Sequence, residues 1–148
     1  MSRHKDRVIL VVEDEEDSLI LLKHAFHKIS LTNPVRAVSN AHSAIAYLAG
    51  NGDFSDRASY PLPNVIMLDL KLAGSSGLEV LQWVRNSPTH RCLVVVVFTS
   101  SDQRQDIQDA YDAGANSYLV KPSSLAHLID LMKIFRDYWV ENNMASTS

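Results

Sequence analysis

Short apolar segments alternate along the chain with segments whose apolar residues recur every three or four positions. The apolar segments cover residues 8–12, 35–38, 65–72, 93–98 and 118–120, with Arg36 inside the second and Asp69 and Lys71 inside the third. Runs of this length, rich in aliphatic and β-branched residues, predict strands that are buried on both faces, as in a parallel sheet. The segments between them predict amphipathic helices, because a spacing of three to four residues places apolar side chains on one helical face.

Five strands that alternate with five helices predict one class of fold. Right-handed crossovers between parallel strands place helices on both faces of the sheet. The expected fold is therefore an α/β, doubly wound, five-stranded parallel sheet in a flavodoxin-like three-layer sandwich, with the strand order 2-1-3-4-5. In this order the crevice for ligands lies outside the carboxyl ends of the first and third strands.

Length and composition agree with one globular domain. The chain has 148 residues, of which 46% are hydrophobic, so it can bury a core of its own. We expect a single domain over residues 1–148, with a core over 7–140 and a disordered polar tail over 141–148. No apolar segment has the length of a signal peptide or a membrane span, which predicts a cytoplasmic protein. The net charge of -3 gives no support for nucleic-acid or membrane partners.

Polar residues follow four of the predicted strands at the point where each strand ends. The first strand is followed by Glu13 and Asp14, the third carries Asp69, the fourth leads to Thr99 and the fifth to Lys121. Because the carboxyl ends of parallel strands meet at one edge of a sheet, these side chains are expected to share one crevice. The sequence therefore predicts a functional site at this edge.

The chemistry of this set follows from its charges. Three carboxylates that lie close together repel one another unless a cation holds them, and a set without His or Cys favours Mg2+ or Mn2+ over zinc. A carboxylate beside such a cation can attack phosphorus and form an aspartyl phosphate. In this hypothesis Lys121 supplies a second cation. Thr99 donates a hydrogen bond to a phosphoryl oxygen that exists only in the modified state.

The same residues occur together in a known family. The chain resembles the response-regulator receiver domains of two-component signalling, as in CheY-like proteins, over residues 7–140. The resemblance implies a phosphoryl-accepting response regulator, which is not an enzyme but assists its own phosphoryl transfer and dephosphorylation. It rests on Val11-Val12-Glu13-Asp14, Asp69 with Gly77 eight residues later, Thr99, Ala113-Gly114-Ala115 and Tyr118-Leu119-Val120-Lys121-Pro122.

The resemblance assigns the metal site and the phosphoacceptor. It implies that Asp69 is the phosphoacceptor, that Asp14 binds Mg2+ directly and that Glu13 binds it through water. The main-chain carbonyl of Lys71 would complete the metal site. Ala73 stands four residues after Asp69, where the family commonly has proline, so the turn that follows is expected to be looser.

The resemblance also implies a switch and a partner. Thr99 and Tyr118 would form the switch pair, and Lys121 would be the family's amine, with a cis peptide bond to Pro122. A narrower likeness is to single-domain receivers that partner phytochrome-type histidine kinases. It rests on the long connection over residues 50–63, the Thr-Ser-Ser-Asp run over 99–102 and the Phe-Arg-Asp-Tyr-Trp run over 135–139.

Two other functions use related residues. An aspartate-nucleophile phosphohydrolase places a second Asp two residues after the first, where this chain has Lys71. A degenerate receiver that serves only as a binding module is the other alternative, and the intact set of Asp69, Thr99 and Lys121 argues against it. Reaction with a small phosphodonor distinguishes the three functions. A stable adduct indicates a receiver, turnover of the donor indicates a hydrolase, and no reaction indicates a binding module.

The last predicted helix carries more apolar surface than one core-facing stripe needs. Its stripe consists of Leu125, Leu128, Met132, Phe135 and Trp139, and an adjoining face adds Leu131, Ile134 and Tyr138. An exposed apolar strip beside polar residues commonly marks an interaction surface. We therefore predict a homodimer, or a partner contact, through the fourth helix, fifth strand and fifth helix, with Ile134 and Tyr138 near its centre.

Overall fold

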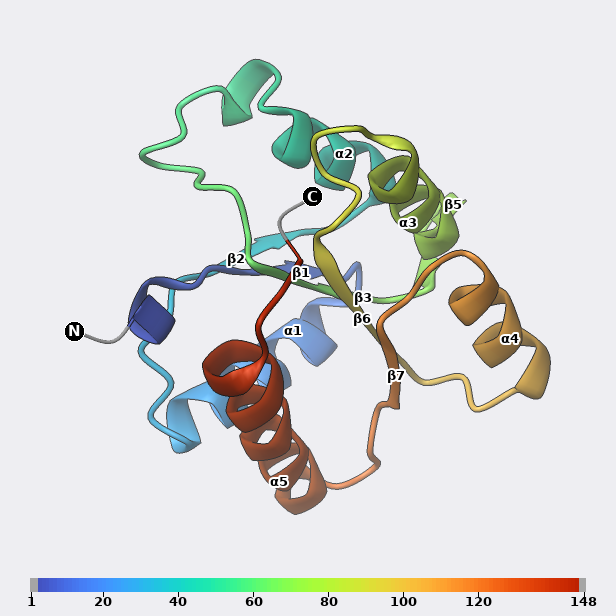
Figure 1. The fold of residues 1–148 in the computed structure, drawn as a ribbon. Helices are drawn as coiled ribbons and strands as arrows, with labels where there is room; N and C mark the ends of the chain where they lie inside the picture. The colour runs from blue at the N-terminus through green and yellow to red at the C-terminus, as the bar shows by residue number, and fades with distance from the viewer. Residues whose placement is uncertain (1–2, 147–148) are drawn as a thin grey trace.

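Residues 3–146 are described by a computed structural model, in which the five predicted strands form one parallel sheet (Figure 1). The strand order is β2-β1-β3-β6-β7, which is the predicted order once a small separate hairpin, β4-β5, is set aside. Every neighbouring pair in the sheet is parallel. The strands of the sheet are β1 (Ile9–Val12), β2 (Val35–Val38), β3 (Val65–Leu68), β6 (Val94–Thr99) and β7 (Ser117–Val120).

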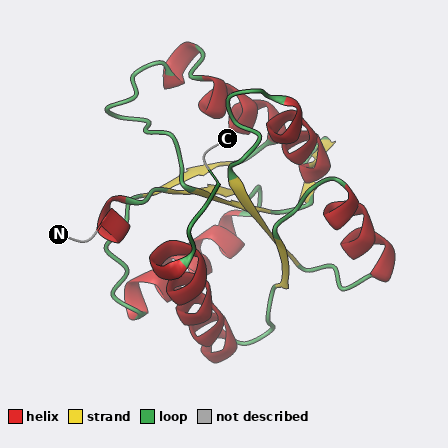
Figure 2. Cartoon of the chain, in the orientation of Figure 1, coloured by secondary structure: helices red, strands yellow, loops and turns green. Residues whose placement is uncertain are grey.

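Helices cover both faces of this sheet, as Figure 2 shows. The α-helices are α1 (Glu16–Lys28), α2 (Ala41–Ala49), α3 (Gly77–Asn86), α4 (Arg104–Asp112) and α5 (Leu125–Phe135). Short 3-10 helices form at η1 (Arg3–Asp6) and η2 (Gly52–Phe54), and a π-helix, η3 (Arg136–Asn142), continues α5. α1 packs against α5, α2 packs against α3, and α4 lies beside β7. None of the helices in residues 3–146 is long and apolar enough to span a membrane.

Alternate residues of the central strands face opposite helical layers. In β1, Ile9 and Val11 belong to the core that contains α1 and α5, whereas Leu10 and Val12 belong to the core that contains α2 and α3. All residues of β1, β3 and β6 are buried. This burial on both faces explains why the strands occur as unbroken apolar runs rather than as alternating ones.

The long connection between α2 and β3 packs against α2 through aromatic and hydrogen-bonded side chains. The rings of Tyr47, Phe54 and Tyr60 contact one another. Arg57 donates hydrogen bonds of 2.7 Å to the main-chain carbonyls of Tyr47 and Leu48, which lie in the last turn of α2. The connection is therefore anchored to the helix that precedes it.

The predicted cis peptide bond is wrong, and the predicted tail is only partly covered. The bond between Lys121 and Pro122 is trans, as are all peptide bonds in the described part of the chain. The trans form is the lower-energy form of a bond before proline, and Lys121 reaches its acidic partners from it. Of the predicted tail, residues 147 and 148 lie outside the described residues.

Candidate functional site

The ends of β1 and β3 bring Glu13 and Asp69 side by side. Val12 pairs with Leu68 in the sheet, and the main-chain N–H of Asp69 donates to the carbonyl of Val12 at 3.0 Å. Glu13 and Asp69 therefore follow paired residues at the same edge. Both residues are buried, with exposed fractions of 6% and 4%. A buried carboxylate is costly unless it is paired, so a compensating cation is required.

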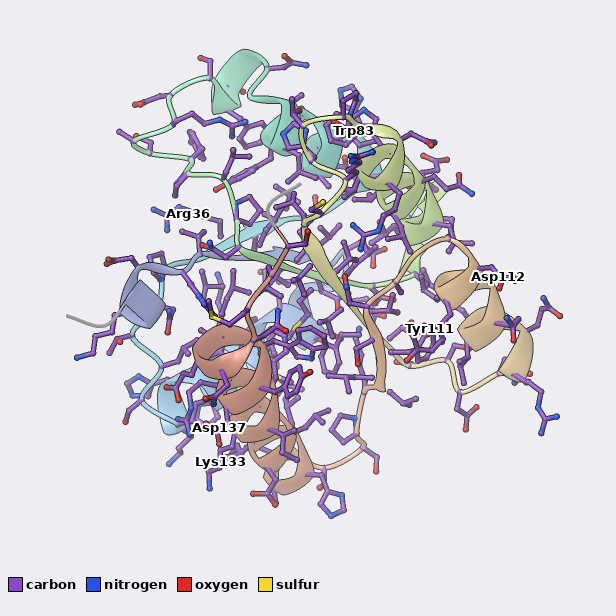
Figure 3. The ribbon with its side chains drawn as sticks, viewed as in Figure 1. Arg36, Trp83, Tyr111, Asp112, Lys133 and Asp137 are labelled. Atoms are coloured by element: carbon purple, nitrogen blue, oxygen red, sulfur yellow. The ribbon has the colours of Figure 1, made fainter. Side chains whose placement is uncertain are left out.

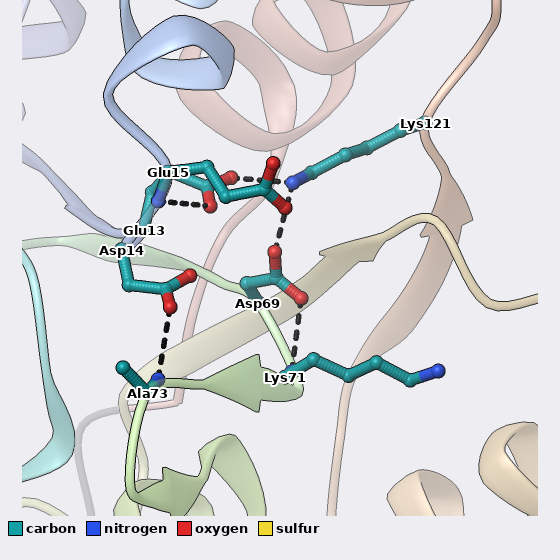
Figure 4. Close-up of polar contacts among 7 residues, drawn as sticks. All are labelled: Glu13, Asp14, Glu15, Asp69, Lys71, Ala73 and Lys121. Carbon is teal, nitrogen blue, oxygen red and sulfur yellow. Dashed lines mark hydrogen bonds and ion pairs between the residues drawn. The ribbon is translucent and has the colours of Figure 1, made fainter.

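Lys121, at the end of β7, supplies that cation. Its Nζ lies 2.5 Å from Oε1 of Glu13 and 2.8 Å from Oδ2 of Asp69 (Figure 4). Burial acts to lower the pKa of Lys121, but the hydrogen bonds to Asp69 and Glu13 and the negative charge of these two carboxylates together outweigh burial, and the pKa is raised. Lys121 is therefore positively charged in the folded protein.

The pKa of Glu13 reflects its burial at this edge of the sheet. Burial raises the pKa of Glu13, although the hydrogen bonds from Lys121 and from the main-chain N–H of Glu15 act in the opposite direction. The latter bond is 3.1 Å long. The raised pKa means that one ammonium group does not fully offset the loss of water around the carboxylate. A further cation would stabilise the charged form.

Asp14 completes a cluster of three carboxylates. One oxygen from each of Glu13, Asp14 and Asp69 lies within 4.8 Å of the other two. Main-chain groups orient all three, since Glu13 accepts from the N–H of Glu15, Oδ2 of Asp14 accepts from the N–H of Ala73 at 2.9 Å and Oδ1 of Asp69 accepts from the N–H of Lys71 at 3.0 Å. An oxygen-only set with a net negative charge fits the ligand preference of Mg2+ or Mn2+.

A small hairpin begins two residues after Asp69. Its strands are β4 (Lys71–Leu72) and β5 (Ser75–Ser76), and Figure 4 shows the side chain of Lys71 pointing away from the three carboxylates. Gly77 follows the hairpin, and a Cβ atom on Gly77 would lie 2.1 Å from the carbonyl oxygen of Asp69. Only glycine permits this approach, which fixes the main chain at the central carboxylate.

The hydroxyl group of Thr99 is buried without a partner. Thr99 is 1% exposed, and within residues 3–146 its Oγ1 is the buried side-chain oxygen that makes no hydrogen bond. Such groups are rare, because an unmet hydrogen bond in the interior is costly. At the carboxyl end of β6, this hydroxyl is a donor available to an acceptor that the protein itself does not supply.

The segment after Thr99 is bonded to both β7 and α4. The hydroxyl of Tyr118 on β7 donates to the carbonyl of Ser101 at 2.8 Å, and the hydroxyl of Ser101 donates to the carboxylate of Asp106 on α4. Burial raises the pKa of Tyr118. A movement of this segment would therefore reach the ring of Tyr118 and the first turn of α4.

Of the nine predicted site residues, the structure brings four into direct proximity, joins Lys71 and Thr99 to them through main-chain hydrogen bonds, bonds Tyr118 to the segment after Thr99, and leaves two elsewhere. The residues at the crevice are Glu13, Asp14, Asp69 and Lys121. Ile134 and Tyr138 lie on the exposed side of α5 and η3, 63% and 57% exposed. Two contacts were not predicted, namely those made by the N–H of Ala73 and by the side chain of Ser101. The sequence signal for the first is only that Ala73 is not proline and so keeps its N–H.

A doubly wound sheet with three acidic residues, a threonine and a lysine at one edge defines the class of a receiver. The response regulator receiver domain family matches residues 9–133, and the chain belongs to this family. The protein is thus a phosphoryl-accepting regulator of the two-component type, and its class is one of signalling proteins rather than enzymes.

Among its relatives are phytochrome response regulators. The chain is 29% identical to response regulator Rcp1 of Synechocystis sp. over 135 residues, which cover 91% of this chain and 90% of Rcp1. The Mn2+-bound form of Rcp1 has a TM-score of 0.84, with 28% identity and coverages of 95% and 99%. Response regulator RPA3017 in red light signaling of R. palustris has a TM-score of 0.90, with 30% identity and coverages of 96% of this chain and 99% of that one. The phosphorylated cyanobacterial phytochrome response regulator RcpA has a TM-score of 0.87, with 28% identity and coverages of 95% of this chain and 98% of that one.

Proposed function

We propose that this receiver takes a phosphoryl group onto Asp69 from a phytochrome-type histidine kinase. The observation that carries the proposal is the buried, unpartnered hydroxyl of Thr99 at the sheet edge that also holds Asp69 and Lys121. A phosphoryl oxygen on Asp69 would give this hydroxyl its acceptor. The kind of kinase is inferred from relatives that are themselves phytochrome or red-light response regulators. A cytoplasmic location for this exchange stays a prediction.

The transfer itself needs few groups. One carboxylate oxygen of Asp69 bonds to phosphorus as the bond from phosphorus to the histidine nitrogen of the kinase breaks, and the leaving imidazole keeps the electron pair and takes up a proton. The phosphoryl oxygens bring negative charge beside Glu13 and Asp14, so positive charge governs the rate. Lys121 is already in contact with Asp69 and supplies one such charge. The same groups would assist hydrolysis of the phosphoryl group.

Mg2+ or Mn2+ would supply the second positive charge by neutralising the phosphoryl oxygens when it is bound. Asp14 and Asp69 would bind the ion directly, Glu13 would bind it through water, and the main-chain carbonyl of Lys71 would complete the site. The close approach of the three carboxylate oxygens supports this assignment, as does the Mn2+-bound form of Rcp1.

Thr99 and Tyr118 would convert the chemical change into a movement. If the hydroxyl of Thr99 turns toward a phosphoryl oxygen, the segment that follows Thr99 moves with it. That segment includes Ser101, whose carbonyl holds the hydroxyl of Tyr118, and the ring of Tyr118 packs near Ala110 on α4. Phosphorylation would thereby bias the position of α4 and the surface around it.

The output surface would be formed by α4, β7 and α5. Five large apolar side chains are exposed on these elements and on η3, namely Tyr111 at 46%, Val120 at 40%, Leu125 at 41%, Ile134 at 63% and Tyr138 at 57%. Figure 3 shows Tyr111 on the side of α4 that faces β7. Exposed apolar side chains favour association, and a symmetric homodimer is the occupant we propose.

Phosphotransfer from a panel of labelled histidine kinases, with phytochrome-type kinases included, tests the function. We expect label to move to the parent chain and not to Asp69→Asn. Loss of label from a kinase without accumulation on the parent would indicate a phosphohydrolase, for which Lys71 is an unsuitable second residue. Failure of every kinase and of small phosphodonors to label the parent would leave only the binding module.

A further inference from the structure

The turn of the β4-β5 hairpin is bonded to one of the proposed metal ligands. The main-chain N–H of Ala73 donates to Oδ2 of Asp14 at 2.9 Å, across 59 positions of the chain. Pairing of Leu72 with Ser75 leaves Ala73 and Gly74 as the two residues of the turn. This bond ties the turn to the end of β1, and the looser turn that the sequence suggested stays a prediction.

This bond orients Asp14, which has fewer hydrogen-bond and ion-pair partners than the other two proposed metal ligands. Glu13 and Asp69 are each paired with Lys121 and accept a hydrogen bond from a main-chain N–H nearby in the chain. Asp14 is half-exposed, and the contact recorded for its carboxylate within residues 3–146 is the one from Ala73. A carboxylate with a single anchor would turn freely if that anchor were lost.

We propose that the N–H of Ala73 is a positioning group for the divalent cation, because it holds the carboxylate of Asp14 toward those of Glu13 and Asp69. The inference rests on the proposed metal site and adds to it a group that is not a ligand. Groups that orient a ligand from behind contribute to metal affinity, since a fixed ligand loses less freedom on binding. By the same coupling, the cation stabilises the turn of the hairpin.

One substitution removes this N–H and disturbs little else. Gly74 has a φ of +73°, whereas Ala73 is not among the described residues with positive φ, and this combination fits a type II turn. Proline is favoured at the first central position of such a turn, which is that of Ala73. The preceding residue, Leu72, lies in β4 and is extended, as the residue before proline must be. Ala73→Pro is therefore the test variant, and Ala73→Ser, which keeps the N–H, is its matched control.

Calorimetric titration with Mg2+ alone measures the effect without any phosphodonor. We expect the dissociation constant of Ala73→Pro to be about tenfold weaker than that of the parent, in the range found when a ligand loses an orienting partner. Ala73→Ser should bind as the parent does. Equal affinity of Ala73→Pro and parent would overturn the inference and leave the metal site intact, whereas a parent that binds no Mg2+ would overturn the site itself.

Amide hydrogen exchange of the parent gives a second test that does not depend on the folding of a variant. Ala73 is exposed, so slow exchange of its N–H requires a hydrogen bond rather than burial. We expect slowed exchange in EDTA and further slowing in Mg2+, because the cation fixes Asp14. Exchange at the rate of an unbonded turn amide in both conditions would overturn the inference.

Discussion

The ammonium group of Lys121 lies 2.8 Å from the carboxylate of Asp69, and this contact joins the last strand of the sheet to the central one. The same ammonium lies 2.5 Å from Glu13, which directly follows the first strand. Both carboxylates are buried, so this one lysine is the cation on which their charged forms depend.

Removing the lysine should therefore destabilise the fold. We expect Lys121→Met to lower the free energy of unfolding by about 3 kcal/mol in EDTA, because two buried carboxylates lose their partner. Mg2+ should restore part of the loss, since it also neutralises them. Urea unfolding with and without Mg2+ measures both effects. Lys133→Met is the control, because the ion pair of Lys133 with Asp130 is exposed. A loss no larger than that of the control would contradict the pairing.

Removing one negative charge from the cluster should instead stabilise the fold in the absence of metal. Asp14 belongs to the crowded set but makes no recorded ion pair with Lys121. We expect Asp14→Asn to raise the unfolding free energy in EDTA by about 1 kcal/mol, through relief of like-charge repulsion, and to remove the stabilisation that Mg2+ gives the parent. Thermal melts in the two conditions check this. A variant that is less stable than the parent in EDTA would mean that the carboxylates do not repel.

Tyr118 should give the stability a dependence on alkaline pH. Burial raises the pKa of Tyr118 above its ordinary value of 10.0, so folding favours the neutral phenol. The contribution of Tyr118 to the free energy of unfolding is full below pH 10.0 and is lost as the pH rises through the raised pKa of the folded state. We expect Tyr118→Phe to be less stable than the parent by about 1 kcal/mol below this range, through loss of the hydrogen bond to Ser101, and the difference to shrink above it.

Urea unfolding over a series of alkaline pH values tests this dependence. Tyr111→Phe is the control, because it removes the hydroxyl group of an exposed tyrosine. If the unfolding free energies of the parent and of Tyr118→Phe differ by the same amount at every pH, folding does not hold the phenol of Tyr118 neutral.

The exposed side of α5 and η3 should govern assembly. We expect Ile134→Asp and Tyr138→Ala to shift the protein toward the monomer and to weaken kinase or target binding, since both truncate exposed apolar side chains that the proposed interface would bury. Light scattering with and without phosphodonor measures the mass, and Lys133→Ala on the same helix is the control. If folded variants keep the oligomeric state and partner affinity of the parent, the output surface lies elsewhere.

The sequence predicted the sheet well because burial on both faces leaves a strong signal. The strands followed from apolar runs, their order followed from the doubly wound class, and the meeting of Glu13 with Asp69 followed from strands that end level with each other. Side-chain pairing was beyond such reasoning. Charge crowding alone treats Asp14 and Asp69 alike, and so predicts that Asp69→Asn raises stability without metal. The structure distinguishes them, because Asp69 is paired with Lys121 and Asp14 is not.

The remaining contacts depend on main-chain geometry that residue types do not encode. The bond from Ala73 to Asp14 requires a hairpin whose turn returns to β1, and the bond from Tyr118 requires a particular position of the carbonyl of Ser101. The resemblance to a family also predicted a cis bond before Pro122 that the structure does not have. Patterns of apolarity thus predict the sheet and its edge, whereas the geometry of individual contacts requires coordinates.

Intact-mass measurement after treatment with acetyl phosphate tests the central claim most directly. The mass of the parent should rise by one phosphoryl group in Mg2+, because transfer brings negative charge beside Glu13 and Asp14 that cations must neutralise. The adduct should be absent from Asp69→Asn and strongly reduced in EDTA. An adduct that survives Asp69→Asn, or that forms equally well in EDTA, would contradict the assignment of Asp69 as a metal-dependent phosphoacceptor.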